Sequence, residues 1–370
     1  MGKNKGMPSV HQLVLELQKR FDVSMLTPDK GVNEGDYSAV NIFHISTIPC
    51  VWKNKYIQFL FARINYIWAC VYVLGHGLIG RYKYDLVYAN YALPGAKALS
   101  MLWSIPLVVR IYGTFLYPVL SSFIQKIIKY EEIFLFNLKA NLYVITDDGT
   151  SGDVVARYYG IDPSRILFLM NGVNSPAQHS FSRKDVNLPQ EAKILLTTSR
   201  LANWKRVDRI IKAMQKTSAN NLVLMIAGDG AELVNLKKMA NMDPRILFLG
   251  ALDGVMIEKL FSICDWYVTM HDVSNIGNPT LQALKSGVPV LTCATGNTEK
   301  LINMKSGNGI CIEFDTELEL INKISHIFND ISLNIIDARD FKDGVRNSAS
   351  KINSWPERIH LEINAIEKLI

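Results

Sequence analysis

The sequence predicts an α/β protein made of two Rossmann-like domains that face each other across a cleft. Three observations predict this fold class. The chain has 370 residues, which is enough for two domains of ordinary size. Hydrophobic residues make up 49% of the sequence and charged residues 20%, so the chain can bury a large core. Short apolar runs alternate with helical patterns, as they do where helices cover both faces of a parallel sheet.

The first half of the chain shows this alternation in a less regular form. Strands are expected at residues 23–26, 40–43, 86–88, 107–112, 142–145 and 166–169. Helices are expected at 9–20, 56–78, 95–102, 122–138 and 152–158. Rossmann-like domains usually open with a strand and a glycine-rich turn. Gly2 and Gly6 could form the turn here but no strand pattern stands before them, so the first strand of the expected domain, residues 1–175, is missing from the sequence. Either the chain is truncated or the domain has one strand fewer.

The second half is more regular. Its expected strands are continuous apolar runs at 194–198, 222–227, 246–249, 266–270, 289–293 and 310–312. Helical patterns fall at 207–215, 231–240, 256–263, 279–285, 298–303 and 317–328. This order predicts a doubly wound domain over residues 193–350, followed by a C-terminal helix within 351–370. Prolines and polar residues predict a linker at 176–192.

Charge and cysteine content narrow the class of protein. The formal net charge is +6, which suits anionic small molecules or an anionic membrane surface. No dense Lys/Arg tract is present, so a nucleic-acid-binding function ranks last. The 5 cysteines are scattered and form no C-x-x-C pair, which argues against structural zinc and disulfides and for a reducing, cytoplasmic environment.

The most apolar segment is residues 56–80. Arg63 and Asn65 interrupt it, leaving a run shorter than the ~20 residues of a membrane span. We expect a long helix buried against a sheet. An interfacial helix at the cytoplasmic face of a membrane is the alternative, because basic residues flank the segment. These are Lys53, Lys55, Arg81 and Lys83.

Two candidate anion-binding features follow expected strands of the second half. In TTSRLANWKR (197–206), Arg200 and Lys205 come just after a strand end, where ligands bind in open α/β sheets. An Arg offers a planar fork to phosphate and a Lys a point charge. In MIAGDGAEL (225–233), Gly228 and Gly230 allow a tight turn and a close backbone approach to a ligand. That turn is neither a G-x-G-x-x-G fingerprint nor a P-loop.

The stretch SNIGNPTLQALKSGVP (274–289) supplies a third strand-end feature. Asn278 is expected to cap a short helix with Pro279 at its first position. The free N–H groups at such a helix start attract anions. Together the three features predict a site for a diphosphate. The candidate residues of this stretch for binding the molecule that carries the diphosphate are Ser274, Asn275, Gly277, Asn278, Pro279, Thr280, Leu281 and Gln282.

Four runs within residues 193–312 resemble the nucleotide-sugar half of retaining group 1 glycosyltransferases, which form glycosyltransferase family four and have the GT-B fold. The runs are SRLANWKRVDRIIKAM, LMIAGDGAEL, ILFLGAL and SNIGNPTLQALKSGVPVLT. The first half is similar at 108–114, 143–150 and 169–174. The tail, 353–369, is similar to a last helix that crosses back to the first domain. The resemblance implies that Arg200 and Lys205 contact the donor's diphosphate as catalytic groups and that Gly228 and Gly230 lie near the nucleotide.

The sequence departs from this family at three positions. Members often carry two glutamates, one for the donor sugar and one for the ribose, where this chain has Ser274 and Gln282. Replacing a charge-assisted bond by a neutral one could cost ~1 kcal/mol. In VVRIYGT, Tyr112 replaces a histidine that faces the donor sugar. The resemblance implies interdomain-cleft residues at Arg110, Tyr112, Gly113 and Thr114.

The resemblance implies a retaining, metal-independent transfer of sugar from a nucleotide-diphosphate sugar, with no cofactor and no metal ligand. A glycan or lipid-linked acceptor, in cell-surface glycan synthesis, and peripheral membrane contact are the expected partners. Because both glutamates are missing, a degenerate protein that binds nucleotide, sugar or a partner transferase without transfer is the alternative. A nucleotide-sugar epimerase with Glu299 in its cleft is a third.

Overall fold

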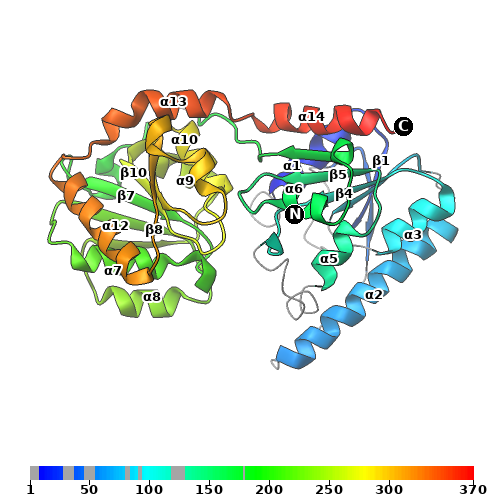
Figure 1. Cartoon of the computed structure of the whole chain (residues 1–370), viewed down its shortest axis with the longest axis horizontal. Coiled ribbons are helices and arrows are strands. Elements are labelled where there is room, and N and C mark those ends of the chain that lie inside the picture. The colour runs from blue at the N-terminus through cyan, green and yellow to red at the C-terminus, as the bar shows by residue number, and fades with distance from the viewer. Residues whose placement is uncertain are drawn as a thin grey trace. The chain divides into compact units, whose positions relative to one another are not determined.

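The structure, a computed structural model, describes residues 8–27, 37–45, 55–79, 84–90, 94–117, 130–177 and 180–370. The chain forms two compact α/β units (Figure 1). Unit 1 contains Met1–Asp147, Ser151–Asn171 and Trp355–Ile370, and unit 2 contains Asp148–Thr150 and Gly172–Ser354. The segment expected as a linker, 176–192, therefore belongs to unit 2, which begins earlier and ends later than the expected domain 193–350.

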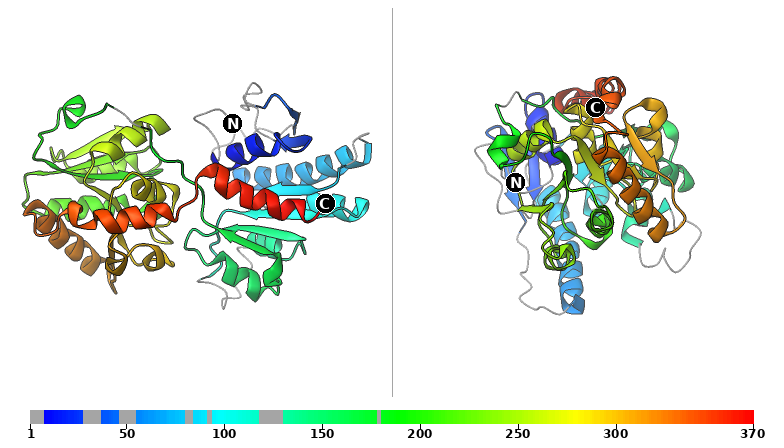
Figure 2. Two further views of the ribbon diagram at one scale, coloured as in Figure 1. Left: turned by 90° about the horizontal axis from the view of Figure 1, so that it is seen from above. Right: turned by 90° about the vertical axis from the view of Figure 1, so that its left-hand side faces the viewer.

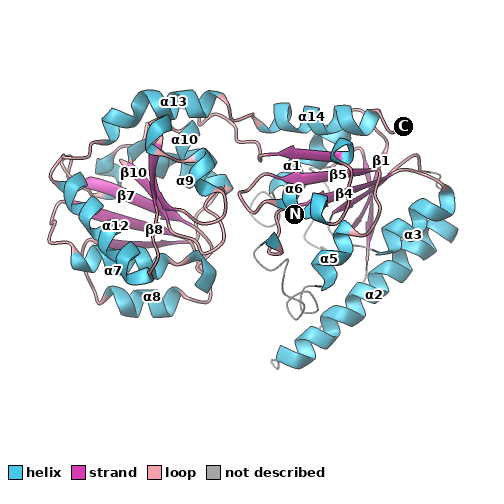
Figure 3. Ribbon diagram, in the orientation of Figure 1, coloured by secondary structure: helices cyan, strands magenta, loops and turns pink. Residues whose placement is uncertain are grey.

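Unit 2 is built on a sheet of six parallel strands in the order β12-β11-β10-β7-β8-β9 (Figure 3). All six expected strands are present: β7 (Lys193–Thr198), β8 (Leu222–Ala227), β9 (Ile246–Gly250), β10 (Trp266–Thr269), β11 (Val290–Cys293) and β12 (Gly309–Ile312). The central strand β7 is buried from its second residue onward, as its continuous apolar run predicts. The strand order reverses between β7 and β10, because the chain continues from β7 to β8 on one side and reaches β10 on the other.

Amphipathic helices cover this sheet. They are α7 (Val207–Lys216), α8 (Leu233–Ala240), α9 (Gly254–Ile263), α10 (Asn278–Lys285), α11 (Thr298–Leu301), α12 (Glu317–Ser332) and α13 (Lys342–Ser350). Helix α9 begins where the Asp253 carboxylate accepts a hydrogen bond from the Met256 N–H, and α12 begins in the same way at Thr316. Short 3₁₀ turns lie at Arg183–Val186, Asn203–Lys205, Met304–Ser306 and Ala338–Phe341.

Unit 1 contains two separate parallel sheets within its described part. One has the order β3-β4-β5-β6, with β3 (Val87–Asn90), β4 (Leu107–Ile111), β5 (Leu142–Thr146) and β6 (Ile166–Leu169). The other pairs β1 (Val23–Thr27) with β2 (Val40–His44). The helices are α1 (Pro8–Leu17), α2 (Lys55–Ile79), α3 (Pro94–Trp103), α5 (Tyr130–Phe136), α6 (Gly152–Tyr158) and α14 (Trp355–Glu367), with a further 3₁₀ turn at Pro163–Arg165. Gly2, Gly6 and residues 122–129 of an expected helix lie outside the described residues.

The last helix, α14, belongs to unit 1, as predicted for a helix that returns to the first domain. It lies beside α1 (Figure 2), with Ile359 and Ile363 packed against Leu13. Its Glu362 carboxylate, 1% exposed, accepts hydrogen bonds from the Tyr88 hydroxyl and the Arg358 guanidinium.

The buried carboxylate of Glu362 also reaches the sheet. Its Oε2 atom lies 3.7 Å from Nη1 of Arg110, which belongs to β4 and is 2% exposed. Arg358 on α14 is 1% exposed. Two buried guanidinium groups therefore share one buried carboxylate, which ties the end of the chain to the centre of unit 1.

Helix α2 differs from the expectation of a helix buried against a sheet. Its inner side packs closely on α3. Gly77 lies so near Leu99 of α3 that a Cβ atom added to the glycine would be 2.1 Å from Leu99 Cδ1. Its outer side carries large apolar residues at spacings of three, four or seven, which places them on one face of the helix. They are 40–65% exposed: Leu60, Ile64, Ile67, Trp68, Val71 and Leu78. Within the described residues, neither α2 nor any other helix combines the length and apolarity of a membrane span.

Candidate functional site

The candidate site lies in unit 2, where the strand order reverses between β7 and β10. At such a point the loops after two neighbouring strands run to opposite sides, which opens a crevice at the carboxyl ends of the strands. The loop after β7 carries Arg200 and Lys205, and the loop after β10 leads into α10. A backbone hydrogen bond of 3.0 Å from Asp272 N to Trp204 O joins the two loops. The structure thus brings together two of the three predicted features.

The third feature, the Gly-Asp-Gly turn after β8, packs against the loop that carries Arg200. The Leu201 N–H donates to Asp229 O at 2.8 Å, and Glu232 N donates to Leu201 O at 3.0 Å. A Cβ on Gly228 would lie 1.8 Å from Ser199 O, and one on Gly230 would lie 2.4 Å from Leu201 O. The close backbone approach predicted for these glycines is therefore to the chain's own loop.

Replacing Gly228 by alanine is expected to lower the free energy of unfolding by about 2–4 kcal/mol, because both strain and overlap are introduced. Its φ of +150° is a conformation that a side chain rarely adopts, and the Ser199 carbonyl occupies the Cβ position. The matched control is Gly254→Ala, since nothing lies within 4 Å of a Cβ there. Urea unfolding of both variants measures the difference. Equal stabilities would show that the Gly228 loop is free to move.

Lys205 is partly buried on the loop after β7. Its Nζ atom is 4.0 Å from the ring centroid of Trp204 and 3.3 Å from Nδ1 of His271. Burial, and after it the positive charge of Arg200, lower the pKa of Lys205 to about 8, and the carboxylate of Asp148 opposes the shift. A desolvated ammonium beside a second cation is an incomplete electrostatic environment that an anion would complete.

Arg200 is exposed. Across the described part of the chain its guanidinium makes no hydrogen bond or ion pair with another side chain, whereas the next arginine along the chain, Arg206, is fully engaged. Arg206 contacts Asp208 at 3.0 Å and Asp272 at 3.1 Å. The loop therefore contains one arginine that fixes the fold and one, Arg200, that is available for a ligand.

His271, which the sequence reasoning missed, organises the loop after β10. It is 7% exposed, and burial followed by the charge of Lys205 lowers its pKa to about 3, so the ring is neutral at neutral pH. With the ring proton on Nε2, the ring donates to Thr269 Oγ1 at 3.0 Å and accepts from Lys205 at Nδ1. Its position directly after the expected strand 266–270 was the signal available in the sequence.

Asn275 is part of the scaffold of this loop. It is 0% exposed, and its Oδ1 accepts from His271 N at 2.8 Å and from Thr269 Oγ1 at 3.0 Å. Its Nδ2 donates to Thr295 Oγ1 at 2.9 Å and to Cys293 O at 3.2 Å. Because protein groups bond both the oxygen and the nitrogen of the amide, Asn275 supports the conformation of the loop.

Ser274 also makes a structural contact. Its hydroxyl donates to Asp148 O at 2.5 Å and accepts from Ile276 N at 3.2 Å, all within unit 2. A Cβ on Gly149 would lie 2.3 Å from this hydroxyl. A glutamate at position 274 would be too long for the same contact.

Helix α10 begins one residue earlier than expected. Gly277 is the N-cap, with φ of −110°, and Asn278 is the first helical residue. The expected Asn278 cap is wrong, because Thr280 and the backbone of Asn275 fix the turn instead, through a Thr280 Oγ1 bond to Asn275 O of 2.5 Å. The Leu281 N–H donates to Gly277 O at 3.1 Å and closes the first turn of the helix. Pro279 and Gln282 are half-buried on this first turn.

The four residues predicted from the first half lie in unit 1. Arg110 is buried and donates to Thr146 Oγ1 at 3.1 Å, and Thr114 donates to the Glu132 carboxylate. Tyr112 donates to Asn90 Oδ1 at 2.6 Å, and burial raises its pKa to about 12. Gly113 has φ of +123° and allows the chain to turn after β4. Arg110 and Thr114 therefore support the interior of unit 1.

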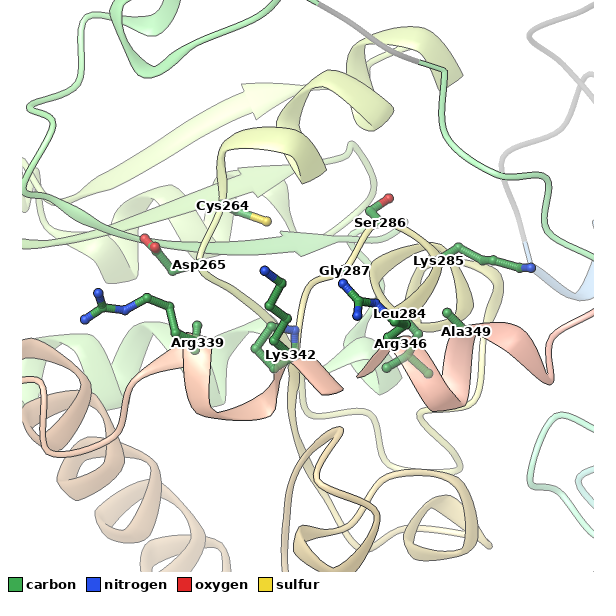
Figure 4. A pocket seen from close by; sticks show the side chains of 12 residues that line it. Cys264, Asp265, Leu284, Lys285, Ser286, Gly287, Arg339, Lys342, Arg346 and Ala349 are labelled. Atoms are coloured by element: carbon green, nitrogen blue, oxygen red, sulfur yellow. The ribbon is translucent and has the colours of Figure 1, made fainter. Parts of the chain in front are cut away.

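A cavity of about 490 Å³ lies elsewhere in unit 2, at the amino ends of β10 and β11 (Figure 4). Lys285, Lys342 and Arg346 line it together with Asp265. Asp265 is already paired with Arg183 at 2.9 Å. Ligands of open α/β sheets bind at the carboxyl ends of the strands, so the cavity is separate from the candidate site.

GT-B glycosyltransferases consist of two α/β units, each built on a parallel sheet, as this chain does. Solved structures of such enzymes match the fold of the chain. The Anabaena protein HepE in complex with UDP-glucose matches with a TM-score of 0.73 and 17% identity over 99% of this chain and 98% of that chain. WaaG, a glycosyltransferase involved in lipopolysaccharide biosynthesis, matches with a TM-score of 0.71 and 13% identity over 97% and 95% of the two chains.

Family comparisons agree with the fold. The family Glycosyl transferases group 1 matches residues 178–343, and Glycosyltransferase Family 4 matches residues 8–175. The chain is a member of the group 1 glycosyltransferases of the GT-B fold. It is 27% identical to an N-acetyl-alpha-D-glucosaminyl L-malate synthase of Bacillus anthracis over 36% of each chain. It is 25% identical to an uncharacterised glycosyltransferase of Methanocaldococcus jannaschii over 46% of each chain. The chain thus matches less than half the length of these two curated relatives.

Proposed function

We propose that this protein transfers a sugar from a nucleoside-diphosphate sugar to an acceptor hydroxyl with retention of the anomeric configuration. The observation that carries the proposal is the pair of cations at the switch point. Lys205 is desolvated beside Arg200, Arg200 has no side-chain partner among the described residues, and the positive end of the α10 dipole lies on the neighbouring loop. Two cations and a helix start suit a diphosphate.

The chemistry follows from where negative charge develops. The acceptor oxygen forms a bond to the anomeric carbon on the face that the diphosphate leaves, while the bond from that carbon to the diphosphate oxygen breaks. The departing phosphate oxygen takes the acceptor's proton, so no separate protein base is needed. Lys205 and Arg200 stabilise the leaving diphosphate more than the bound donor, which is the requirement for catalysis. Because protein cations take this role, we propose that transfer is independent of metal and persists in EDTA.

Donor binding is expected to weaken as the pH rises above about 8. In the free protein Lys205 loses its proton around that pH, and the neutral amine no longer attracts a diphosphate. Affinity should therefore be constant below the pKa and fall above it. Titration calorimetry with the nucleoside diphosphate at pH 7, 8 and 9 measures this. Lys205→Arg should remove the pH dependence, since a guanidinium stays charged. A flat profile in the unmodified protein would contradict the role of Lys205.

The decisive experiment is a thermal-shift screen of the protein with UDP, GDP, ADP and CMP and their sugars, followed by a transfer assay with the nucleotide that binds. A ligand that binds only the folded state raises its stability. The shift should disappear in Arg200→Ala and Lys205→Ala and persist in Lys238→Ala, an exposed lysine of α8 in the same unit. No shift with any nucleotide would refute donor binding at this crevice.

A second candidate function is nucleotide or sugar binding without transfer. The observation that favours it concerns position 274, where group 1 members often carry a glutamate for the donor sugar. This chain has a serine there, and its hydroxyl is bonded to Asp148 O. The two functions differ in one measurement. A thermal shift with a nucleotide sugar, but neither transfer nor hydrolysis of that sugar, would establish the binding function.

We also propose that the acceptor lies at a membrane surface, as a lipid-linked or cell-surface glycan does. The support is the apolar outer face of α2 and the charge around it. In the sequence, residues 46–109 contain 6 lysines and arginines against a single aspartate, Asp85. A basic segment with an exposed apolar helix face suits the interface of an anionic bilayer.

Replacing Ile67 and Trp68 by serine is expected to lower binding to anionic liposomes by about 100-fold, because burying two large apolar side chains in the interface contributes roughly 3 kcal/mol. Both are among the exposed residues of α2, at 63% and 45%. The control is Val234→Ser, which replaces an apolar residue of unit 2 that is more exposed still, at 76%. Co-sedimentation with vesicles containing phosphatidylglycerol measures the effect. Equal sedimentation of all three proteins would exclude α2 as the contact.

A further inference from the structure

The cavity of about 490 Å³ at the amino ends of β10 and β11 has no part in the proposed reaction. Three stretches of unit 2 form its walls. Cys264 and Asp265 precede β10, residues within 284–289 lead from α10 into β11, and residues within 338–349 run from a 3₁₀ turn into α13. Small-molecule sites have volumes of about 300–1,000 Å³. The cavity is therefore large enough to hold a ligand of its own.

The residues that line the cavity are mostly basic where they are charged. Four cations face one carboxylate, that of Asp265, and the cations are Lys285, Arg339, Lys342 and Arg346. In Figure 4 the side chains of Lys342 and Arg346 rise from α13 toward the loops that carry Cys264 and Gly287, while Lys285 and Arg339 extend to the two sides. The positive charge of Lys342 and Arg346 is thus directed into the cavity.

The Asp265 carboxylate does not balance this charge. It accepts hydrogen bonds from Arg183 Nη2 at 2.9 Å and from Ile194 N at 2.7 Å, and neither partner lines the cavity. Arg339 is likewise paired with Asp337, at 2.6 Å. Because both of these charges are matched by other groups, the charge that remains in the cavity is that of the three other cations.

These three cations have no counter-charge. In the part of the chain that the structure describes, the side chains of Lys285, Lys342 and Arg346 make no hydrogen bond or ion pair, not even with Asp343 on the same helix. Lys342 and Arg346 are four residues apart on one face of α13, where like charges repel. Lys342 is also the first residue of α13, at the positive end of the helix dipole. A bound anion would relieve each of these repulsions.

Helix α13 is held in place by residues that do not line the cavity. Val345 is 0% exposed, and Ser348 Oγ accepts a hydrogen bond from Asn308 Nδ2 at 2.9 Å. A Cβ on Gly344 would lie 2.1 Å from Gly307 O, so the two backbones are in close contact. Lys342 and Arg346 therefore project from a fixed support, which lowers the entropic cost of binding a ligand.

We infer that this cavity binds a small phosphomonoester through Lys342 and Arg346. A phosphomonoester carries a charge of about −1.5 to −2 at pH 7, which matches a pair of cations, whereas a carboxylate carries only one charge. Its oxygens can accept from the ammonium and from the guanidinium fork together. Leu284, Pro289 and Ala338 line the rest of the cavity, which suits the uncharged body of such a molecule. The inference is independent of the proposed transfer reaction.

The test is titration calorimetry of the full chain with three matched probes: glucose 6-phosphate, glucuronate and glucose. We expect glucose 6-phosphate to bind with an affinity that falls as salt is added. Glucuronate should bind about 10-fold more weakly or worse, because it offers one charge in place of two, and glucose should not bind. No binding of glucose 6-phosphate, or equal binding of glucuronate, would overturn the inference.

Variants place the probe in the cavity. Lys342→Ala and Arg346→Ala should each weaken the binding of glucose 6-phosphate by about 10-fold or more. Lys351→Ala should leave it unchanged, since this exposed lysine follows α13 and does not line the cavity. All three side chains are exposed, and thermal unfolding without ligand checks that the variants fold. Full affinity in a folded Lys342→Ala, Arg346→Ala double variant would refute the site.

Two further measurements exclude other sources of binding. Lys205→Ala should keep the affinity for glucose 6-phosphate, because Lys205 lies on the loop after β7 at the candidate donor site. Loss of binding in Lys205→Ala but not in Arg346→Ala would place the phosphate in the donor crevice and overturn the inference. Vesicles containing phosphatidic acid present the same phosphomonoester on a lipid. If Arg346→Ala abolished binding to these vesicles while free glucose 6-phosphate did not bind, the ligand would be a lipid headgroup and not a small molecule.

Discussion

Replacing Lys205 by alanine is expected to lower kcat for sugar transfer by about 10²–10³-fold, the effect of removing one preorganised stabiliser of a developing negative charge. The ammonium is held by Trp204 at 4.0 Å and by His271 at 3.3 Å, so the protein has already met the cost of its orientation and desolvation. Arg200→Ala should raise KM as well, because Arg200 is exposed and unpaired among the described side chains and is free to contact the bound donor. Steady-state kinetics with the donor identified by the nucleotide screen measures both.

The conservative variant Lys205→Arg provides the control for this prediction. It keeps the charge and should recover part of the lost kcat, whereas Lys238→Ala on α8 should behave as the unmodified protein. If Lys205→Ala retained full activity, the cation pair would not stabilise the leaving group and the proposed mechanism would be wrong.

Replacing Glu362 by alanine is expected to destabilise unit 1 by about 3–5 kcal/mol, because it leaves two buried guanidinium groups without a counter-charge. Arg110 and Arg358 are 2% and 1% exposed, so water cannot replace the carboxylate. The matched control is Glu367→Ala on the same helix, whose contact with Arg20 at 3.3 Å is exposed and contributes about 0–1 kcal/mol. Urea unfolding followed by hydrogen exchange in β4 and α14 measures both. Equal stability of the two variants would contradict a structural role for the buried cluster.

The sequence was a good guide wherever one element alone determines the pattern. The apolar run 194–198 could only be a covered strand, and β7 is one. Arg200 and Lys205 could be placed at a strand end, because a strand end is a local feature and the crevice rule supplies the rest.

The sequence was a poor guide wherever a side chain's role depends on a partner far along the chain. The Ser274 hydroxyl donates to the backbone carbonyl of Asp148, 126 residues apart in the sequence, and no local pattern indicates this contact. Gly228 approaches the Ser199 carbonyl in the same way, and its approach to a ligand stays a prediction. His271 was missed because its neutral state results from burial and from Lys205, and neither can be read from the letters around it. The outer face of α2 was expected to be buried because apolar composition was visible and packing was not.

The return of the chain to unit 1 has a consequence for how the protein is made. A ribosome releases the chain from its N-terminus, so β4 is synthesised long before α14, and both segments of unit 2, Asp148–Thr150 and Gly172–Ser354, are synthesised between them. Throughout that interval Arg110 and Tyr88 lack the Glu362 carboxylate that they bind in the finished protein. Unit 2 can therefore fold on the ribosome before α14 is made, while unit 1 is completed only after its last helix has emerged.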